Sequence, residues 1–425
     1  MKLSDRAGIV VPLGLTALAA GGAARLLAPR ERLPSPLPVE PETVFSAEEI
    51  RAGRAYQRPQ RRIRLVASAL ELGALAGVVR TGGRPQTDGG RSAARSRPAV
   101  GAAGAAAAAV GLSLGGTLLG LPTRALSRRR ALAAGLSTDS WSSWAGDLVK
   151  ATAIEAGLSA GLLAGSSLLA ARLGPRWWRA AAGGAVGVGV LAGLLGPVLL
   201  DPVFNRFDPL PDGETRRDVL ALAAAAGVQV KEVFSVDASR RTTAVNAYVN
   251  GLGPTKRVVL YDTLLKDYGR DEVRFVVAHE LGHVHHRDVV RQLIFLALVA
   301  PPAALSVQQL TLAWAGELTG ARAVPALSLA ARAAGLPLVL GVTGLSRAVE
   351  RRTDQFGLEV SQAPEALISF FRRIAVQNRA DVTAPGPVRA RLATHPPITE
   401  RIGAALAFQN ARAAGDRDSR TRAGS

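Results

Sequence analysis

Three residues within one pentapeptide have the types and the spacing needed to hold a metal ion and use it. The segment Val273–Asp288 is rich in apolar residues and contains His279, Glu280 and His283 in the order His-Glu-Leu-Gly-His. On an α-helix, residues four apart share one face, so both imidazoles can bind the same Zn²⁺ ion. Glu280 is then placed to accept a proton from metal-bound water and to pass it to a leaving amine. The pattern predicts zinc-dependent hydrolysis.

Two surface histidines on an amphipathic helix would give the same pentapeptide without any metal. The apolar residues around it argue against that alternative, because they predict a helix packed into a protein interior. The chain also contains no cysteine. Disulfides, thiolate-bound zinc and a cysteine nucleophile are therefore excluded, and any metal must be bound by His, Asp or Glu.

Catalytic zinc normally has three protein ligands and one exchangeable water, so a third ligand is needed. Glu350 and Asp354 are one helical turn apart, and Glu350 could bind the metal while Asp354 accepts the second N–H of a ligand histidine. Taken alone, a Glu/Asp pair beside Arg351 and Arg352 is more often a solvated face with ion pairs. His395 precedes two prolines, which predict an extended turn, and by itself it would be an ordinary loop residue.

Seven stretches are apolar enough to cross the hydrocarbon core as helices, which takes roughly 20 residues. Their composition is mostly Ala, Leu, Val and Gly with 4% aromatic residues, and small residues let helices pack closely in a bilayer. The stretches lie near 7–28, 63–80, 99–122, 152–173, 178–200, 290–314 and 324–345. The first also resembles a cleavable signal peptide, because Lys2 and Arg6 precede its apolar run. We favour an uncleaved span.

Between the fifth and sixth spans the apolar runs shorten and charged residues return. Strand-like pieces appear there at Val230–Val236, Ala244–Asn250 and Arg257–Tyr261, flanked by helical patterns. The expected fold class is therefore a mainly α membrane protein with about seven transmembrane helices and an inserted α+β zinc metallopeptidase domain of the zincin type.

The expected parts follow from these patterns. Residues 1–200 hold five spans joined by polar loops, and residues 201–289 form the zinc domain. Residues 290–345 hold two further spans, residues 346–408 complete the catalytic domain, and residues 409–425 form a basic flexible tail. The polar loops are expected at 29–62, 81–98 and 123–151.

The net charge of +19 raises nucleic-acid binding as an alternative. The arginines lie in clusters between apolar stretches, with no interleaved aromatic residues to stack on bases, so we expect membrane lipid and no nucleic acid as partners. A cytoplasmic 201–289 domain would place the loops 29–62 and 123–151 and the carboxyl terminus inside, as the positive-inside rule favours. The outer loop 81–98 also carries four arginines, which weakens that contrast.

In order and spacing, these motifs resemble the Ste24-type integral-membrane CAAX prenyl proteases of the M48 metallopeptidases. The resemblance extends in segments from about Pro202 to Ile402, with a weaker likeness in FSAEEIRAGRAYQRPQRR at 45–62. Besides HELGH it includes PVFNRFDPLPDGE at 202–214, RTTAVNAYVNG at 241–251, KRVVLYDTLL at 256–265, SRAVERRTD at 346–354 and THPPITERI at 394–402.

The resemblance implies one Zn²⁺ per chain with His279, His283 and Glu350 as its ligands and Glu280 as the base. It also implies that Asp354 is the partner of a ligand histidine.

Three further residues gain a role from the resemblance. His395 would lie near the substrate or its developing oxyanion. Asn246 and Tyr248 would belong to an edge strand by the metal cleft, with which a peptide could pair as an added strand. The family's helices surround an intramembrane chamber that the zinc domain closes.

Two positions depart from the family's common pattern. Thr353 stands where relatives commonly have Ala, and Asp288 stands where eukaryotic members commonly have His. We expect neither residue to touch the metal ligands. The composition is typical of a high-GC bacterial chain, and bacteria generally lack prenylated CAAX proteins. The expected role is therefore cleavage of damaged or mistargeted membrane polypeptides in a bacterial cell membrane, and recognition of prenyl-like groups stays open.

Two other interpretations remain at this point. An HtpX-like quality-control protease would have fewer spans before residue 201. A catalytically silent zinc-binding membrane scaffold would not need Glu280, because structural zinc requires no base. Within the spans, Glu71 and Glu155 are expected to face a polar interior or to pair with arginine, since an ionised group in lipid is costly. Either could instead lie nearer the membrane interface.

Overall fold

The computed structural model describes residues 3–82, 98–251, 256–383 and 386–423 of the chain. Within these residues, seven long helices coincide with the seven predicted spans. They are α1 (Leu3–Leu27), α3 (Ala47–Thr81), α4 (Pro98–Ala133), α5 (Trp141–Leu173), α6 (Trp177–Leu195), α11 (Asp288–Ala315) and α12 (Ala323–Ser361). Short turns of 3-10 or π-helix, η1 (Gly174–Arg176) and η2 (Gly196–Leu200), follow α5 and α6.

Hydropathy and length identify membrane-crossing stretches among the described residues. Five stretches qualify, and one of them, Trp141–Leu195, contains both α5 and α6. Helix α3 is not among the five, because charged residues fill its first half.

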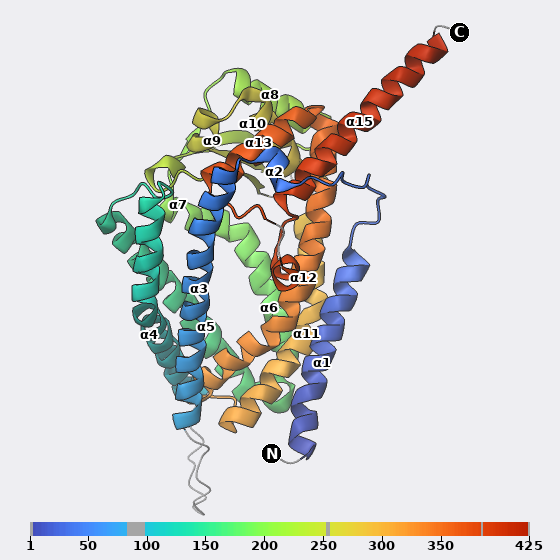
Figure 1. Cartoon of the computed structure of the whole chain (residues 1–425). Helices are drawn as coiled ribbons and strands as arrows, with labels where there is room; N and C mark the ends of the chain where they lie inside the picture. Colours follow the sequence, from blue (N-terminus) through green and yellow to red (C-terminus); the bar gives the residue numbers. More distant parts are fainter. Residues whose placement is uncertain (1–2, 83–97, 252–255, 384–385, 424–425) are drawn as a thin grey trace, which may run out of the picture.

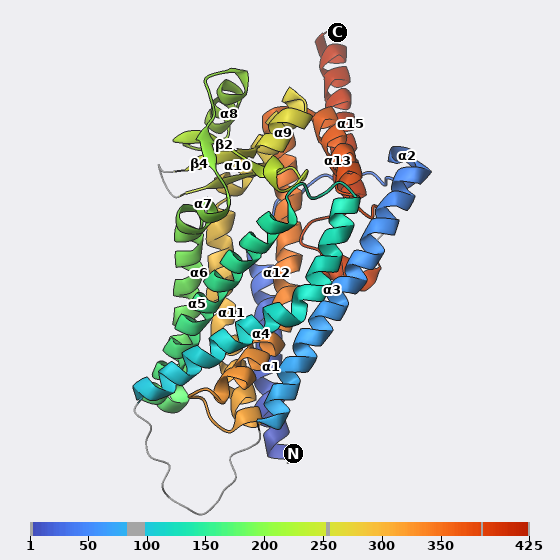
Figure 2. The same cartoon turned by 90° about the vertical axis from the view of Figure 1, so that its left-hand side faces the viewer.

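The long helices run from the end of the molecule that holds the amino terminus to a cap that holds the sheet (Figures 1 and 2). Helix α4 packs along α5, and α1 packs against both α11 and α12. Helix α12 continues without a break from the membrane part into the cap. Residues at its far end therefore belong to the cap although they share a helix with a membrane span.

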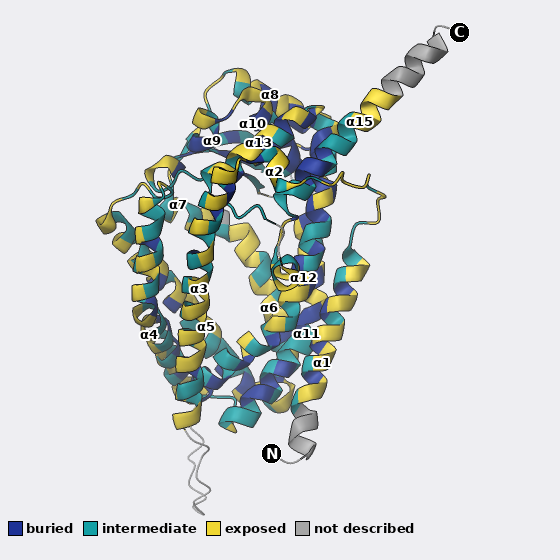
Figure 3. Ribbon diagram, in the orientation of Figure 1, coloured by how far each residue is buried: buried dark blue, intermediate teal, exposed yellow. Residues whose placement is uncertain are grey.

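Many apolar side chains on the long helices are not covered by protein. Leu18 is 74% exposed, Leu65 71% and Leu118 66%. Figure 3 shows exposed residues along these helices, whereas buried residues are concentrated in the cap and along α11 and α12. An apolar surface of this kind is stable when lipid covers it.

The cap contains a small mixed sheet with the strand order β1-β2-β4-β3. Its strands are β1 (Phe207–Pro209), β2 (Glu232–Val236), β3 (Ala247–Asn250) and β4 (Arg257–Tyr261). β2 and β4 are parallel, and the two outer strands are antiparallel to their neighbours. The three longer strands match the predicted pieces. The fourth, β1, has only three residues and no alternating pattern that could have predicted it.

Helices cover the sheet and complete the cap. They are α2 (Pro41–Val44), α7 (Asp201–Phe204), α8 (Glu214–Ala225), η3 (Ala238–Arg240), α9 (Asp262–Asp267), α10 (Arg270–His285), α13 (Pro364–Gln377), α14 (Pro387–Leu392) and α15 (Ile398–Ala423). Val258 and Leu260 of β4 and Val277 and Leu281 of α10 are completely buried in one core. Each such side chain stabilises the fold by about 1.5–3 kcal/mol.

Two of the predicted polar loops are largely helical. In the 29–62 segment, α3 begins at Ala47, where the Ser46 hydroxyl and the Glu49 carboxylate cap each other's N–H groups. In the 123–151 segment, α4 continues to Ala133 and α5 begins after the N-cap Ser140. Hydropathy locates the part of a helix that lies in lipid, whereas capping residues set where the helix begins. The loop predicted at 81–98 lies almost entirely outside the described residues.

The carboxyl-terminal segment differs from the predicted flexible tail. Helix α15 continues to Ala423 and projects from the cap (Figure 1). Alanine and arginine have high helix propensities, so a run rich in them continues a helix that the cap has already nucleated.

Helix α1 is packed into the bundle. Thr16 is completely buried, and its hydroxyl lies 2.9 Å from that of Ser306 on α11. A Cβ at Gly341 of α12 would lie 2.8 Å from the Ala20 carbonyl oxygen, so α1 and α12 are close because this position is glycine. Loss of α1 would expose the surface of α11 and α12 that it covers.

The two carboxylates within predicted spans have different surroundings. Glu71 of α3 pairs with Arg332 of α12 at 3.6 Å, as expected for a carboxylate that would otherwise be unpaired in lipid. Glu155 of α5 is exposed on the surface of its helix.

Gly403 of α15 lets the segment between α1 and α2 pass across the cap. The Leu37 N–H donates to the Gly403 carbonyl (3.1 Å), and a Cβ at residue 403 would lie 2.1 Å from the Leu37 carbonyl oxygen. Gly403→Ala should therefore destabilise the protein by about 1–3 kcal/mol through overpacking. A thermal melt in detergent measures this, with Gly146→Ala as the control, because no atom lies within 4 Å of a Cβ there. Equal melting of the two variants would contradict the prediction.

Candidate active site

Helix α10, which contains HELGH, is fixed at its start by Glu272. The Glu272 carboxylate accepts hydrogen bonds from the Gly269 N–H (2.7 Å) and the Ser369 hydroxyl (2.7 Å), and it pairs with Arg373 (2.6 Å). An acidic residue in the first turn also interacts favourably with the helix dipole. Because Ser369 and Arg373 belong to α13, the helix is anchored about two turns before its histidines begin.

Small residues allow α10 and α12 to pack closely beside the histidines. A Cβ at Gly282 would lie 3.0 Å from Phe356 and Thr353 of α12. On the other helix, a Cβ at Gly357 would lie 3.2 Å from the Phe275 ring and 3.4 Å from the His279 backbone. The glycines thus bring the carboxylates of α12 within reach of the histidines of α10.

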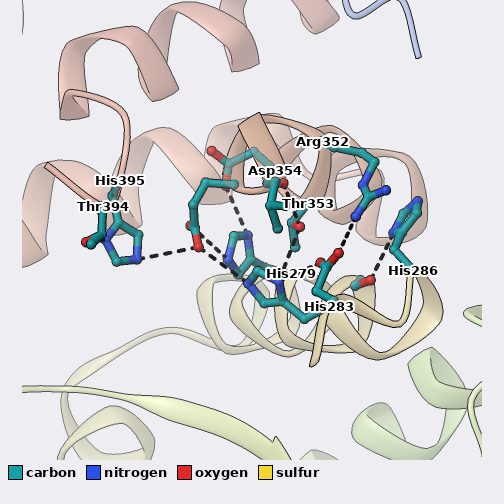
Figure 4. A network of polar contacts seen from close by, with 12 residues as sticks. His279, His283, His286, Arg352, Thr353, Asp354, Thr394 and His395 are labelled. Carbon is teal, nitrogen blue, oxygen red and sulfur yellow. Dashed lines mark hydrogen bonds and ion pairs between the residues drawn. The ribbon is translucent and has the colours of Figure 1, made fainter. Parts of the chain in front are cut away.

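His279 and His283 lie next to each other where these two helices meet (Figure 4), and Glu350 of α12 contacts both. The Nε2 atoms of His279 and His283 each lie 3.6 Å from a different oxygen of the Glu350 carboxylate. One ligand atom from each of the three residues lies within 4.8 Å of the other two. The predicted third ligand is thus brought to the two histidines.

This donor set fits a zinc ion. Ligand atoms bound tetrahedrally at about 2.0–2.1 Å are about 3.4 Å apart, close to the separations in the cluster. Oε2 of Glu350 is also buried without a hydrogen bond from any described residue. A buried carboxylate oxygen without a hydrogen bond is costly, and a cation among the three donors would bind it directly. Two imidazoles and one carboxylate are a known ligand set of catalytic zinc.

The electrostatic surroundings differ between His279 and Glu280. Burial lowers the pKa of His279, but the carboxylates of Asp354 and Glu350 outweigh that effect and raise it to about 10, so positive charge is favoured there. Removal from water raises the pKa of the Glu280 carboxyl above its usual value, against the opposing effect of the two histidines. A carboxyl with a raised pKa is a better proton acceptor than a solvated one.

Asp354 is completely enclosed between His279 and Arg401. Its Oδ1 lies 3.0 Å from the Nδ1 atom of His279, and both of its oxygens accept hydrogen bonds from Arg401, at 2.5 and 2.7 Å. The guanidinium also lies 4.0 Å above the Phe371 ring and 3.6 Å from Glu350. A bidentate arginine fixes the plane of the carboxylate, and the carboxylate in turn fixes the imidazole.

His395 reaches the cluster from the turn before α15. Its Nε2 lies 3.5 Å from Oε1 of Glu350, and its side chain is 60% exposed. The Thr394 hydroxyl lies 2.9 Å from its other ring nitrogen (Figure 4). The tertiary structure therefore brings this loop histidine to the open side of the cluster.

The comparisons with known proteins agree with this geometry. The model described as Peptidase family M48 matches residues 209–408, and the model described as CAAX prenyl protease N-terminal, five membrane helices, matches residues 30–206. The protein named uncharacterized metalloprotease YhfN of Bacillus subtilis is 31% identical over 312 residues, which are 71% of this chain and 72% of that protein. The chain belongs to peptidase family M48.

Two further relatives of this M48 peptidase come from yeasts. CAAX prenyl protease 1 of Saccharomyces cerevisiae is 41% identical over 112 residues, 26% of this chain and 25% of that protein. The crystal structure of Ste24p from S. mikatae superposes with a TM-score of 0.73 at 20% identity, covering 94% of this chain and 98% of that one. The chain is therefore a multi-pass membrane metalloprotease with the Ste24p fold, and its five-helix segment before residue 207 does not fit the alternative with fewer spans.

Among the described residues, the hydrogen bonds of Asn246 and Tyr248 go to residues other than His279, His283 and Glu350. The Asn246 carbonyl accepts a hydrogen bond from the Tyr261 N–H (3.1 Å) at the start of β3, an edge strand. Ala247 is buried in the core with α10, and its neighbours in the strand therefore point to the opposite face. There the Tyr248 hydroxyl donates to Asp201 (3.4 Å).

One expectation about the family departures is wrong. Oδ2 of Asp288 lies 3.0 Å from the Nδ1 atom of His283, and the Thr353 hydroxyl lies 3.5 Å from the same atom. Both residues therefore contact a predicted ligand. The turn after α10 folds Asp288 back onto the helix, and a close helix contact brings Thr353 to it, so neither contact could be read from sequence distance.

Sequence reasoning also missed two arginines. Arg401 lies six residues after His395 in the THPPITERI segment and pairs with Asp354. Arg352 is buried and pairs with Asp288 (2.5 Å), whereas its neighbour Arg351 pairs with Glu400 nearer the solvent. The segment THPPITERI visibly contains an arginine and a glutamate. Nothing in its spacing indicated which residues these two would pair with.

The remaining two histidines have structural contacts. Nδ1 of His285 lies 2.8 Å from the Ala226 carbonyl oxygen, and Nδ1 of His286 lies 2.9 Å from that of Gly282. Both rings pack against Phe356. These contacts end α10 and join it to α8 and α12.

Asp354→Asn tests how the first ligand histidine is oriented. The amide retains the shape of the carboxylate but loses its charge, so we expect zinc affinity or activity to fall about 10- to 100-fold. Competition with a chelator measures the affinity, and Asp271→Asn on the exposed side of α10 is the control. Unchanged zinc affinity in Asp354→Asn would show that the Asp354 charge does not support His279.

Proposed function

We propose that this M48 peptidase is a membrane-embedded zinc metalloendopeptidase in which Glu280 activates the attacking water. The observation that carries this proposal is the convergence of His279, His283 and Glu350, from two helices, beside the half-buried Glu280. Two nitrogen donors, one oxygen donor and an adjacent carboxylate with a raised pKa are the parts that zinc-assisted hydrolysis requires.

A zinc ion bound there would lower the pKa of water and polarise the scissile carbonyl. Glu280 accepts the proton as the water oxygen attacks the carbonyl carbon, and then delivers it to the leaving amine. Asp354, held by Arg401, contacts Nδ1 of His279 and so orients its imidazole. No covalent enzyme intermediate is needed, which agrees with the absence of cysteine from the chain.

Substrate contacts are proposed at two places. His395 is exposed at the open side of the cluster and would donate to the negative charge that develops on the carbonyl oxygen. β3 is an edge strand, so an extended peptide can add to it through main-chain hydrogen bonds. In this proposal Asn246 contributes to that edge, and Tyr248 holds the strand through Asp201.

The substrate is proposed to be a polypeptide that is associated with the membrane. The catalytic cluster stands where α12 passes from the membrane part into the cap, so a membrane-anchored chain can reach it. The arginine-rich ends of α3 and α4 and the carboxyl-terminal helix favour a cytoplasmic cap in a bacterial cell membrane. Cleavage of damaged or mistargeted membrane proteins is the role that fits this placement, and prenyl-like groups are a second possibility to test.

Chelation tests the proposal. The purified protein in detergent should cleave an unfolded membrane protein, lose that activity after zinc removal with a chelator, and regain it when zinc is added back. A CAAX-type peptide with and without its lipid, assayed in parallel, shows whether prenyl groups are recognised. Cleavage that survives complete removal of zinc would refute the metallopeptidase mechanism.

Reporter fusions test the orientation. A reporter joined after residue 425 should be active in the cytoplasm, and one joined before residue 1 should be active outside. A carboxyl-terminal reporter that is accessible from outside would overturn the proposed topology.

A further inference from the structure

Asp288 is a buried carboxylate that the proposed chemistry does not use. It is the first residue of helix α11 and only 2% exposed. Its Oδ2 atom lies 3.0 Å from the Nδ1 atom of His283, opposite the ring nitrogen that faces Glu350. The carboxylate therefore contacts a metal ligand from behind.

A strained turn places Asp288 there. Helix α10 ends at His285 and α11 begins at Asp288, and Arg287 between them has a left-handed backbone conformation with φ 55°. Residues other than glycine adopt this conformation at an energetic cost, which persists only where the surrounding contacts hold it. The turn folds the start of a membrane helix back against the side chain of His283.

Two arginines occupy the other carboxylate oxygen. Oδ1 of Asp288 accepts hydrogen bonds from Arg352 of α12 (2.5 Å) and from Arg291 of α11 (3.3 Å). Oδ2 is left for the imidazole. The two guanidinium groups hold the carboxylate in place, so that Oδ2 can accept a hydrogen bond from Nδ1–H, which leaves the Nε2 lone pair for a metal.

The same arrangement occurs at the other histidine. Asp354 contacts Nδ1 of His279 at 3.0 Å and is held by Arg401 at 2.5 Å. Asp288 contacts Nδ1 of His283 at the same distance and is held by Arg352 at the same distance. Each histidine of the cluster thus has its own carboxylate and arginine behind it. Figure 4 shows Asp354 beside His279 and Arg352 on the side of His283.

The second set reaches the amino-terminal helix. Arg291 also donates to the Leu27 carbonyl at the last residue of α1, and Arg352 lies 3.8 Å from Glu31 just beyond it. The packed residues Ala23, Phe295 and Val349 hold α1, α11 and α12 together on the membrane side of these contacts. A chain of contacts therefore runs from α1 through an arginine and Asp288 to the imidazole.

We propose that Asp288 is a positioning residue that, with Arg352 and Arg291, fixes the tautomer and the orientation of His283 and ties them to the packing of α1 and α11. This inference rests on the proposed zinc site. It assigns a role to the position at which the chain departs from the eukaryotic pattern. A purely structural Asp288 would stabilise the turn without affecting how the metal is held.

The test compares Asp288→Asn with the matched control Asp271→Asn, whose side chain is 75% exposed on α10. The amide keeps the shape of the carboxylate but removes its charge. We expect zinc to pass to a chelator about 10- to 100-fold faster from Asp288→Asn than from wild type, and the control to be unchanged. The visible absorption bands of the cobalt-substituted protein should also shift, because the ligand field of His283 changes, and Asp288→Glu should recover part of the wild-type zinc retention.

The outcomes separate the two proposals. Wild-type protein that binds neither zinc nor cobalt refutes the zinc site itself. Wild-type protein that binds zinc, with the same release rate and cobalt spectrum in Asp288→Asn, overturns only the role of Asp288. If Asp288→Asn does not fold, Arg291→Gln leaves the carboxylate in place and should release zinc several-fold faster than wild type. An unchanged rate in that folded variant would also overturn the inference.

Discussion

Replacing Glu280 with glutamine should abolish peptide cleavage while zinc stays bound. Glutamine keeps the size of the side chain and cannot accept the proton of the attacking water. General acid–base catalysis contributes about 100- to 10,000-fold, so we expect kcat to fall by that factor. The three ligands His279, His283 and Glu350 are untouched, and zinc content should match that of wild type. Cleavage rates and metal content measured on the same preparations test both parts of this expectation.

Glu359→Gln is the matched control for this experiment. Glu359 is an exposed glutamate on α12, and its carboxylate contacts only Gln355 among the described residues. The control should cleave at the wild-type rate. If Glu280→Gln also cleaves at that rate, Glu280 is not the base. If it loses zinc as well as activity, the residue has a structural role that the geometry does not indicate.

Replacing Glu350 with glutamine should instead remove the metal. The neutral amide no longer balances the charge of the ion, and one of three protein ligands is weakened. Loss of an outer partner costs about 10- to 100-fold in metal affinity, so loss of a ligand charge should cost more than about 100-fold. Zinc content after dialysis should fall far below one per chain, and cleavage should fall with it. Added zinc should restore part of the activity, which distinguishes this variant from Glu280→Gln.

A thermal melt shows whether the Glu350→Gln variant loses activity because it lacks zinc or because it does not fold. Zinc stabilises only the folded state to which it binds, so wild type should melt at a higher temperature with zinc than without it. Glu350→Gln should melt like zinc-free wild type and respond little to added zinc. Full zinc occupancy with full activity in Glu350→Gln would exclude this residue as the third ligand.

The site residues that could be predicted are those fixed by local geometry. His279 and His283 are one helical turn apart, and so are Glu350 and Asp354, and a helix places each pair on one face whatever surrounds it. Joining the two pairs needed the resemblance to known proteases. Nothing in local spacing says that α10 and α12 meet, because that contact depends on Gly282 and Gly357, whose missing side chains leave the necessary space.

The residues that were missed act across long separations. Arg352 and Arg351 are neighbours in the sequence, yet one is buried against Asp288 and the other pairs nearer the solvent with Glu400. Helical periodicity indicates that the two side chains point in different directions. It does not indicate which of them faces the protein interior. Asp288 was expected to lie away from the ligands, and the left-handed turn at Arg287 brings it back to them.

In the membrane part, too, some features could be predicted from the sequence and others were missed. Apolar length predicted all seven long helices, because about 20 apolar residues are needed wherever a helix crosses a bilayer. It did not predict that α3 begins at Ala47, where Ser46 and Glu49 cap the helix. The Ser-Ala-Glu-Glu sequence contains that capping pattern, so this start could have been found from the sequence.

The most direct test of the zinc site is an anomalous diffraction measurement at the zinc absorption edge on crystals of the purified wild-type protein. We predict one peak per chain at about 2.0–2.2 Å from Nε2 of His279, Nε2 of His283 and an oxygen of Glu350. The absence of a peak there in a preparation that cleaves its substrate would contradict the account, as would a zinc peak held by other residues.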